Sequence, residues 1–410
     1  MLVRRHEVWD SEGRALPEVA SNRIVVGATI PMTLYLFHRD LVHGLVERGW
    51  DVTLATDWRG SEQGNDDLRV RKASIPMTRE LSPFGDALAL NRWVRLIRGV
   101  RPLAAFVGTP KAGLLAMIAS RLTQVPVRIL VLHGMRSQGL GGWRRQVVLA
   151  TELLSVRLST HTLSVSPSLS ADVVMASPGL ASRLTVLGHG SIAGVDCERF
   201  RPPTADERRE ARDQLGVGER PFVIGFLGRL AVDKGVQVLL EAVGSLHNGG
   251  RDVVLLLVGA PDLGDSPDDR FLRQQLAAAP DWVIQVGWLS DVTLGLHAMD
   301  VLALPTRREG FGVANIEAAS CGLPVITTNV TGARDSVVDG ETGLLIPAQD
   351  AHRLQHAITS LMDDPGLCQS LGRRGRERVL RDFSSTEVAG RILDFIEDAS
   401  RGTVASTGQG

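Results

Sequence analysis

The chain is poor in cysteine. Its 410 residues include only three, Cys197, Cys321 and Cys368, and none of them forms a CxxC pair or a Cys/His cluster. That spacing argues against a disulfide-stapled scaffold and against a structural zinc site. We therefore expect a protein that folds on its apolar cores alone and works in a reducing compartment, the cytoplasm.

Long apolar runs are absent as well. No stretch approaches the roughly 20 apolar residues that a membrane-spanning helix needs. The first twenty residues alternate charged and small apolar groups, without the apolar core of a signal peptide. The sequence thus predicts a protein that is not integral to a membrane, with residues 1–21 as a flexible extension.

The common nucleotide-phosphate motifs are missing too. There is no G-x-G-x-x-G after the first predicted strand, no G-x-x-x-x-G-K-[ST] and no D-x-D pair. The first two absences argue against dinucleotide-dependent oxidoreductases and P-loop NTPases. The third leaves no acidic pair to hold Mg²⁺ against a diphosphate. We therefore expect no metal and no other cofactor, with cationic side chains and helix ends taking the metal's electrostatic role.

The net charge of −1 conceals an asymmetry between the two halves. Residues 1–195 carry 23 Lys and Arg against 15 Asp and Glu, a net charge of +8, whereas residues 196–410 carry 22 against 31, a net charge of −9. Between residues 87 and 160 there are eleven basic residues and one acid, Glu152. Two interpretations remain open: solvated faces of opposite sign, or a basic surface for an anionic partner.

Apolar, β-branched runs alternate with helical apolar spacing along the chain. The first half has the runs NRIVVGAT, DVTLAT and VRILVLHG, with LYLFHRDLVHGLVERG spaced like a helix. After a charged, turn-rich linker near residues 195–220, the pattern restarts with PFVIGFLG, the helix GVQVLLEAVGSLH, DVVLLLVGA, WVIQVGW, DVLALPT and PVITT. This alternation predicts an α/β fold of two Rossmann-like, doubly wound parallel sheets. Ligands are expected between the halves, outside the carboxyl ends of the strands.

The loop after the first strand of the second half, GRLAVDKG, collects two cations at a helix start. Gly228 frees the backbone, Arg229 and Lys234 lie five positions apart, and Gly235 begins a helix. An arginine fork, a mobile lysine charge and the partial positive charge of a helix end together suit a diphosphate. A solvated basic turn is the alternative.

The stretch LPTRREGFGVANIEAAS repeats this arrangement two βα units later. Glu309 ends a buried strand, where it could accept hydrogen bonds from sugar hydroxyls. Glu317 lies further along the helix, within reach of a vicinal diol such as a ribose. Backbone amides between the two acids could hold phosphate oxygens; this segment consists of Gly310, Phe311, Gly312 and Val313. A capped helix with an acid in its first turn is the alternative.

Four stretches of the chain, taken in order, resemble those of retaining glycosyltransferases of family 4. They are VLGHGSIAGVDCERF, GRLAVDKG, EGFGVANIE and GLPVITTNVTGARDSVVDGETGLLIP. The resemblance runs over most of residues 22–400 and implies the two-domain GT-B fold. Residues 22–195 would form the acceptor-binding domain, completed by a final crossover helix at about residues 385–400. Residues 196–384 would form the nucleotide-sugar-binding domain.

The resemblance also implies roles for the residues of the second half. Arg229 and Lys234 would hold the donor diphosphate, with Gly228 beside them, and Glu309 would hold the sugar. The backbone of residues 310–313 would lie near sugar and phosphate, and Glu317 would hold the ribose. Two residues would flank the base without identifying it: Trp288 and Leu289.

In the first half, His133 ends the strand in VLVLHGMR. It resembles the family histidine that meets the donor sugar and phosphate, and we expect it to act catalytically with Arg229, Lys234 and Glu309. On its own, a histidine before a glycine is more often structural.

A narrower resemblance concerns the acceptor. The stretches GTPKAGLLAMIASRLTQVPVRILVLHGMR and SVSPSLS resemble bacterial transferases that build surface polysaccharide or oligosaccharide repeats on a polyprenyl diphosphate, usually from UDP-sugars. Where those show His-x-His-Thr-Pro-Lys, this chain reads FVGTPK at residues 106–111, a departure that bears on the acceptor. Lys111 and Arg136 are candidates for binding an acceptor diphosphate. Trp143, Arg144 and Arg145 could contact anionic headgroups at the inner face of a membrane, or merely solvate a helix.

The family reaction would transfer a sugar from a nucleotide diphosphate sugar to an acceptor hydroxyl with retention at the anomeric carbon. Only Glu309 is placed as a possible nucleophile, which favours same-face attack assisted by the departing phosphate over a covalent glycosyl-enzyme. Three alternatives stay open: a tailoring transferase for a soluble small molecule, a GT-B sugar-nucleotide epimerase or phosphorylase, and a non-catalytic sugar-nucleotide-binding subunit.

Overall fold

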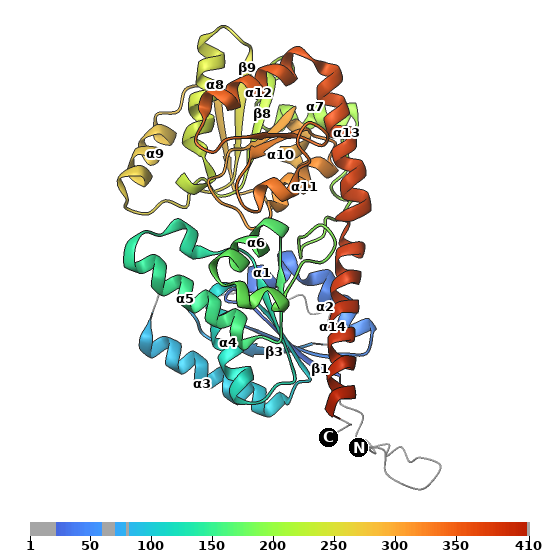
Figure 1. The fold of residues 1–410 in the computed structure, drawn as a ribbon. Helices are drawn as coiled ribbons and strands as arrows, with labels where there is room; N and C mark the ends of the chain where they lie inside the picture. Colours follow the sequence, from blue (N-terminus) through green and yellow to red (C-terminus); the bar gives the residue numbers. More distant parts are fainter. Residues whose placement is uncertain (1–21, 60–69, 79–81, 408–410) are drawn as a thin grey trace. The chain divides into compact units, whose positions relative to one another are not determined.

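The computed structural model describes residues 22–59, 70–78 and 82–407. The chain divides into two compact units, each drawn in Figure 1. Unit 1 takes the residues up to Ser164, Ala176–Thr185 and the chain from Ala389 onward, and unit 2 takes Val165–Met175 and Val186–Val388. Residues 1–21, predicted to form a flexible extension, lie outside the described residues.

Unit 1 is built on a seven-stranded sheet in which every pairing is parallel. The strand order is β3-β2-β1-β4-β5-β6-β7. Ile24, Val25 and Val26 of β1 are fully buried, as expected for a parallel strand that is covered on both faces. The strands are β1 Arg23–Gly27, β2 Asp51–Thr56, β3 Arg71–Ser74, β4 Ala104–Gly108, β5 Val127–Leu132, β6 His161–Ser164 and β7 Leu184–Thr185.

The spacing LYLFHRDLVHGLVERG, predicted as helical, forms two helices instead of one. They separate at His38, whose φ of −124° and ψ of 6° leave the helical region. The break places the His38 ring in the interior, fully buried and edge-on to Phe106 with ring centroids 5.5 Å apart. The helices and 3₁₀ turns of this unit are α1 Pro31–Phe37, α2 Arg39–Glu47, α3 Pro83–Val100, α4 Pro110–Leu122, η1 Arg136–Gly139, α5 Gly142–Leu158 and η2 Pro178–Arg183.

The final helix, α14 (Ser385–Thr407), belongs to unit 1 from Ala389 onward. Its apolar stripe is buried there, with Ile392 and Ile396 almost without exposed surface. At its polar edge, the Arg48 guanidinium donates to Asp394 Oδ1 at 2.7 Å. The last helix of the chain therefore packs into the hydrophobic core of unit 1, which the first strands and helices of the chain also form.

Unit 2 has a six-stranded parallel sheet in the order β10-β9-β8-β11-β12-β13. Its strands are β8 Phe222–Leu227, β9 Val253–Val258, β10 Val283–Gly287, β11 Val301–Leu304, β12 Val325–Thr328 and β13 Leu344–Ile346. Its helices and 3₁₀ turns are α6 Pro167–Ala176, α7 Ala205–Gln214, η3 Val232–Lys234, α8 Val236–Asn248, α9 Pro267–Ala277, α10 Thr293–Ala298, α11 Val313–Ser320, η4 Ala333–Ser336, α12 Ala351–Asp363 and α13 Pro365–Asp382. Helix α7, opened by a Thr204–Glu207 capping box, occupies the stretch predicted as a linker.

The two parallel sheets confirm the predicted α/β class, and each sheet has a point where its strand order reverses. In unit 1, β1 lies between β2 and β4, and in unit 2, β8 lies between β9 and β11. At such a point the loops leaving two neighbouring strands diverge, and ligands bind beyond the carboxyl ends of those strands. The loops after β8 and β11, and those after β1 and β4, are therefore where a site is expected.

Candidate active site

The loops that leave β8 and β11 bring a lysine and a glutamate together. Lys234 ends η3, after β8, and Glu309 lies in the turn after β11. The Lys234 Nζ donates to Glu309 Oε2 at 2.5 Å, and the two side chains are only 19% and 25% exposed. Two motifs that are 75 positions apart in the sequence thus meet in one ion pair.

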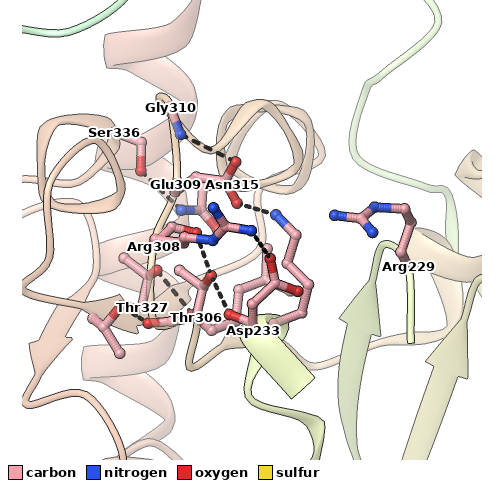
Figure 2. Close-up of polar contacts among 12 residues, drawn as sticks. Arg229, Asp233, Thr306, Arg308, Glu309, Gly310, Asn315, Thr327 and Ser336 are labelled. Atoms are coloured by element: carbon pink, nitrogen blue, oxygen red, sulfur yellow. Dashed lines mark hydrogen bonds and ion pairs between the residues drawn. The ribbon is translucent and has the colours of Figure 1, made fainter. Parts of the chain in front are cut away.

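Hydroxyl and main-chain contacts fix these two loops against each other. Thr306 Oγ1 lies 3.0 Å from the carbonyl oxygen of Asp233 and 2.8 Å from that of Arg308 (Figure 2). The Arg307 amide donates to the same Asp233 oxygen at 2.8 Å, and the Arg308 guanidinium pairs with the Asp233 carboxylate at 3.2 Å. Because Thr306 is buried, water competes little for these bonds. The separation of the two loops is therefore set by the fold itself.

Two glycines shape the turn between Glu309 and α11, one within it and one packed against it. Gly312 has a φ of 88°, in the left-handed region, and no side chain caps the helix that it opens. A Cβ on Gly332, from the loop after β12, would lie 2.3 Å from the Glu309 carbonyl oxygen. Phe311 is buried against Phe383, with ring centroids 5.2 Å apart, and anchors the tip of the turn.

Asn315, which the sequence did not single out, lies beneath this turn. It is buried, and its Nδ2 donates to Ser336 Oγ at 2.8 Å, whereas its Oδ1 has no partner in the described part of the chain (Figure 2). Above it, the Gly310 amide donates to Glu309 Oε1 at 3.3 Å, and Val313 begins α11. An unpaired buried acceptor costs stability, and native structures keep few of them. The glycine turn therefore packs over the buried Asn315–Ser336 hydrogen bond, a contact that the sequence did not predict.

Arg229 belongs to a second acid–base pair. It follows Gly228, whose φ of 149° favours glycine and whose carbonyl oxygen would lie 1.8 Å from a Cβ on Gly259. The Arg229 guanidinium pairs with Asp262, in the loop after β9, and both side chains are about half-exposed. In Figure 2 it stands apart from the contacts around Thr306. The two cations predicted to hold the donor diphosphate are thus each paired with a carboxylate in the folded chain, Arg229 with Asp262 and Lys234 with Glu309.

Glu317 lies on α11, two turns beyond Glu309, and only part of its surface is exposed. Burial raises its pKa to about 7, against a smaller opposing effect of Arg199. Trp288 and Leu289, predicted to flank a base, follow β10; Trp288 is 69% exposed, and the Leu289 side chain approaches Gly295 of α10. An exposed indole beside a strand end is available for stacking.

Replacing Glu317 with glutamine should remove a loss of stability that the wild type shows as pH rises. A carboxyl whose pKa moves from 4.5 to about 7 on folding binds its proton more tightly in the folded state. The free energy of unfolding of the wild type should therefore fall between about pH 4.5 and 7, by up to about 1.4 kcal/mol per pH unit. Urea denaturation at several pH values measures this.

Glu341→Gln provides the matched control, because it makes the same substitution at a carboxylate that is exposed to solvent. If wild type and Glu317→Gln show the same pH dependence, Glu317 is ionised throughout and the raised pKa is wrong.

His133 lies in unit 1, directly after β5. Its ring Nε2 is buried without a partner in the described part of the chain, and burial lowers its pKa to about 4. A Cβ on Gly108 would lie 2.4 Å from that Nε2, so glycine at this position makes room for the ring. His38 lies beside it with ring centroids 6.2 Å apart, and burial together with His133 lowers the pKa of His38 to about 3. Sequence reasoning missed His38, which looked like one residue of a helix.

The two predicted acceptor-binding cations also lie in unit 1, near the carboxyl ends of β4 and β5. The Lys111 Nζ pairs with Asp86 Oδ1 of α3 at 2.8 Å. Arg136 opens η1, and its amide donates to the buried Glu152 Oε1 of α5 at 2.6 Å. The structure brings Lys111 and Arg136 to the rim of one pocket and adds Asp86 and Glu152, which the sequence did not assign.

Across residues 22–59, 70–78 and 82–407, no group of three or more His, Cys, Asp or Glu side chains is arranged to hold a metal ion. None of the helices in these ranges is both long and apolar enough to cross a bilayer.

Known proteins share both halves of this architecture. A family model described as glycosyl transferases group 1 matches residues 207–378, and a glycosyl transferase 4-like domain matches residues 37–190. The capsular polysaccharide biosynthesis glycosyltransferase CapM of Staphylococcus aureus is 32% identical over 365 residues, which are 88% of this chain and 92% of CapM. A GDP-mannose-dependent α-(1-6)-phosphatidylinositol monomannoside mannosyltransferase of Mycolicibacterium smegmatis is 30% identical over 211 residues, 50% of this chain and 54% of that one.

Among solved structures, Anabaena HepE in complex with UDP-glucose superposes with a TM-score of 0.76 at 19% identity, covering 92% of this chain and 99% of HepE. At that identity the likeness speaks for the fold alone, and it confirms the predicted GT-B architecture.

Proposed function

The chain belongs to the group 1 glycosyl transferases, in glycosyltransferase family 4, and from this we propose that it moves a sugar from a nucleotide diphosphate sugar to an acceptor hydroxyl with retention at the anomeric carbon. The observation that carries the proposal is the Lys234–Glu309 ion pair at the strand-order reversal of unit 2. It sets a diphosphate-binding cation beside a carboxylate that can accept sugar hydroxyls, next to an uncapped helix start.

Negative charge grows on the leaving β-phosphate as the glycosidic bond breaks. Lys234, Arg229 and the amides at the start of α11 stabilise that charge more in the transition state than in the ground state, which is the condition for catalysis. Each cation first exchanges its carboxylate partner for phosphate oxygens, Lys234 leaving Glu309 and Arg229 leaving Asp262. The released Glu309 then accepts hydrogen bonds from the sugar, and the released Asp262 carboxylate is half-exposed and can be solvated by water.

Retention by same-face attack suits this residue set. A retaining hydrolase uses two carboxyl groups about 5–5.5 Å apart, one of them as nucleophile. Once Lys234 has turned to the phosphate, Glu309 keeps the Gly310 amide contact and accepts hydrogen bonds from the sugar hydroxyls, which assigns it to holding the sugar and not to nucleophilic attack. The departing phosphate then takes the acceptor proton. Positive side chains supply the electrostatic stabilisation, so we propose that transfer needs neither a metal nor another cofactor.

The donor is most simply a UDP-sugar. The choice follows the resemblance of residues 108–136 and 164–170 to transferases that usually use UDP-sugars, whereas the mycobacterial relative is named as GDP-mannose-dependent. The acceptor we propose is a lipid-linked saccharide in surface polysaccharide synthesis, because CapM is named for capsular polysaccharide biosynthesis and the mycobacterial relative for a phosphatidylinositol mannoside.

This acceptor places the enzyme at the cytoplasmic face of the membrane. The exposed Trp143, Arg144 and Arg145 of α5 would contact anionic headgroups there, each cation contributing about 1 kcal/mol near such a surface. A tailoring transferase for a soluble small molecule is the second candidate, and transfer without any lipid would favour it.

The test is the thermal unfolding midpoint with saturating UDP, GDP, ADP or NAD. A nucleotide at about 100 times its dissociation constant stabilises by about 2.7 kcal/mol, so the midpoint of wild type should rise with UDP. Arg229→Ala/Lys234→Ala should lose that rise, and EDTA should not change it.

The matched control is Arg209→Ala/Arg373→Ala, which removes two exposed arginines paired within their own helices, and it should keep the rise. If no nucleotide shifts the wild-type midpoint, or only NAD does, the proposed function fails. A rise with GDP or ADP alone would retain the transferase and change the donor.

A further inference from the structure

A pocket of about 680 Å³ opens in unit 1 between the start of α4, the end of β5 and the first half of α5. This volume lies in the range of about 300–1,000 Å³ that is typical of small-molecule sites. Most of the wall is aliphatic, and its branched side chains include Leu114, Leu115, Leu130, Leu132 and Val148. Such a wall can bury the apolar part of a ligand.

The rim carries an excess of cations. Lys111, Arg136 and Arg144 line the pocket together with two acids, Asp86 and Glu152. Glu152 is already engaged inside the protein, because it accepts from the Arg136 amide at 2.6 Å and from Ser137 Oγ at 2.7 Å. The rim is therefore suited to an anionic group that lies at the mouth while its apolar part enters the pocket.

A strained residue holds this rim in place. Thr109 joins β4 to α4 with a φ of 67°, a conformation that β-branched residues rarely adopt and that costs about 1–3 kcal/mol. Its Oγ1 accepts from the Thr29 amide at 3.0 Å and lies 2.7 Å from Thr29 Oγ1. These bonds tie the loops after β1 and β4 together at the strand-order reversal of unit 1. Strain kept at such a point is typical of a binding site.

The apolar surface does not stop at the mouth of the pocket. Leu140, Trp143 and Val147 all line the pocket, yet they remain exposed, Trp143 to 72%. A compact ligand that filled the pocket would not need them. A chain longer than the pocket would continue across them towards solvent or a bilayer.

We propose that this pocket binds the hydrocarbon chain of a lipid-linked acceptor, with the acceptor's phosphate or diphosphate head against Lys111, Arg136 and Arg144. The inference rests on the proposed function, whose acceptor it locates. The occupant is the acceptor lipid, not a phospholipid of the bilayer, because Lys111, Arg136 and Arg144 line the same pocket as the aliphatic wall and are not confined to an open face.

The test is isothermal titration calorimetry with farnesyl diphosphate, a soluble molecule with the same chain and head chemistry. The wild type should bind it, and Thr151→Trp, which fills the pocket from α5, should weaken binding at least tenfold. The neighbouring Ala150 is exposed and outside the pocket, so Ala150→Trp should change affinity less than twofold.

The head contacts are tested in the same way. Arg136→Ala/Arg144→Ala should also lose at least tenfold in affinity. Arg121→Ala/Arg157→Ala removes two exposed arginines near the far ends of α4 and α5 and should change it less than twofold. Inorganic diphosphate, which has no chain, should bind Thr151→Trp and wild type equally.

Two results would overturn the pocket assignment. One is equal affinity of wild type and Thr151→Trp for farnesyl diphosphate. The other comes from a parallel titration with phosphatidylglycerol vesicles: Thr151→Trp weakens binding to the vesicles but not to farnesyl diphosphate. If such a result comes while UDP still raises the unfolding midpoint, only this inference fails. If no nucleotide binds but the pocket variants lose farnesyl diphosphate, the proposed function fails and the lipid site stands.

Discussion

Lys234→Ala should lower kcat/KM for sugar transfer by about 10²–10³, the loss seen when one preorganised donor to a developing negative charge is removed. The lysine is largely buried and lies in a loop that Thr306 and Arg307 fix to Asp233, so once it has exchanged Glu309 for the donor phosphate its charge stays in place during the chemical step. The loss should fall mainly on kcat, because the interaction strengthens as the β-phosphate departs. Steady-state kinetics with the nucleotide sugar found by the thermal screen measures it.

A merely structural lysine would behave differently. Lys234→Ala leaves Glu309 partly buried without its partner, which costs stability by itself. The double variant Lys234→Met/Glu309→Gln removes both charges of the pair and should recover most of the lost stability while remaining inactive. If the double variant regains activity, or if Lys234→Ala loses less than threefold, Lys234 only neutralises Glu309.

Acid should destabilise unit 1 through its two neighbouring histidines. Burial lowers the pKa of His38 to about 3 and that of His133 to about 4, whereas both return to about 6.5 on unfolding. Between these values the unfolded chain binds more protons, so the free energy of unfolding falls as pH falls below about 6.5. The slope is about 1.4 kcal/mol per pH unit for each histidine. Over two pH units this amounts to several kcal/mol, a large part of a typical domain's stability.

Urea denaturation of wild type, His38→Leu and His352→Leu between pH 4.5 and 7.5 measures this. His38→Leu should lose about half of the acid sensitivity. It should remain stable at neutral pH, because the His38 ring nitrogens of the wild type have no hydrogen-bond partner of normal geometry in the described chain that the substitution would remove. His352 is exposed on α12 of unit 2, and its replacement should leave the slope unchanged. Equal slopes in wild type and His38→Leu would show that His38 titrates normally in the folded protein.

Much of the fold could be predicted because parallel strands covered on both faces must be apolar along their whole length. The runs PFVIGFLG and DVVLLLVGA became β8 and β9, and GVQVLLEAVGSLH became α8. The helix in LYLFHRDLVHGLVERG was harder, since its spacing is helical on both sides of His38. The chain breaks there because the ring packs against Phe106, a residue 68 positions away (106 − 38) that local periodicity cannot detect.

The candidate site was predictable where the conformation of a turn follows from residues within a single motif. Glycine spacing indicated the turn at residues 310–312 and the helix beyond it, and Gly312 does adopt the left-handed conformation. Partners from other loops were not predictable. Asp262 pairs with Arg229 only because β9 ends beside β8, and Asn315 looks like any polar residue of a helix until Ser336 is placed under it. The pocket of unit 1 is formed by helices and strands packed together from residues 86 to 155, and no short motif in the sequence predicts that packing.

Neither unit is a contiguous stretch of polypeptide: unit 1 is assembled from three segments and unit 2 from two. A single crossover between relatives near residue 195 therefore does not exchange a complete unit 1. A chimera joined there would combine one parent's β1 and α2 with another's α14, and the fit of Gly44 against Leu393 and of Arg48 against Asp394 would be left to chance. A transplant of the lipid pocket should instead carry residues 389–407 along with the first half, so that the inherited unit keeps the helix that closes its core.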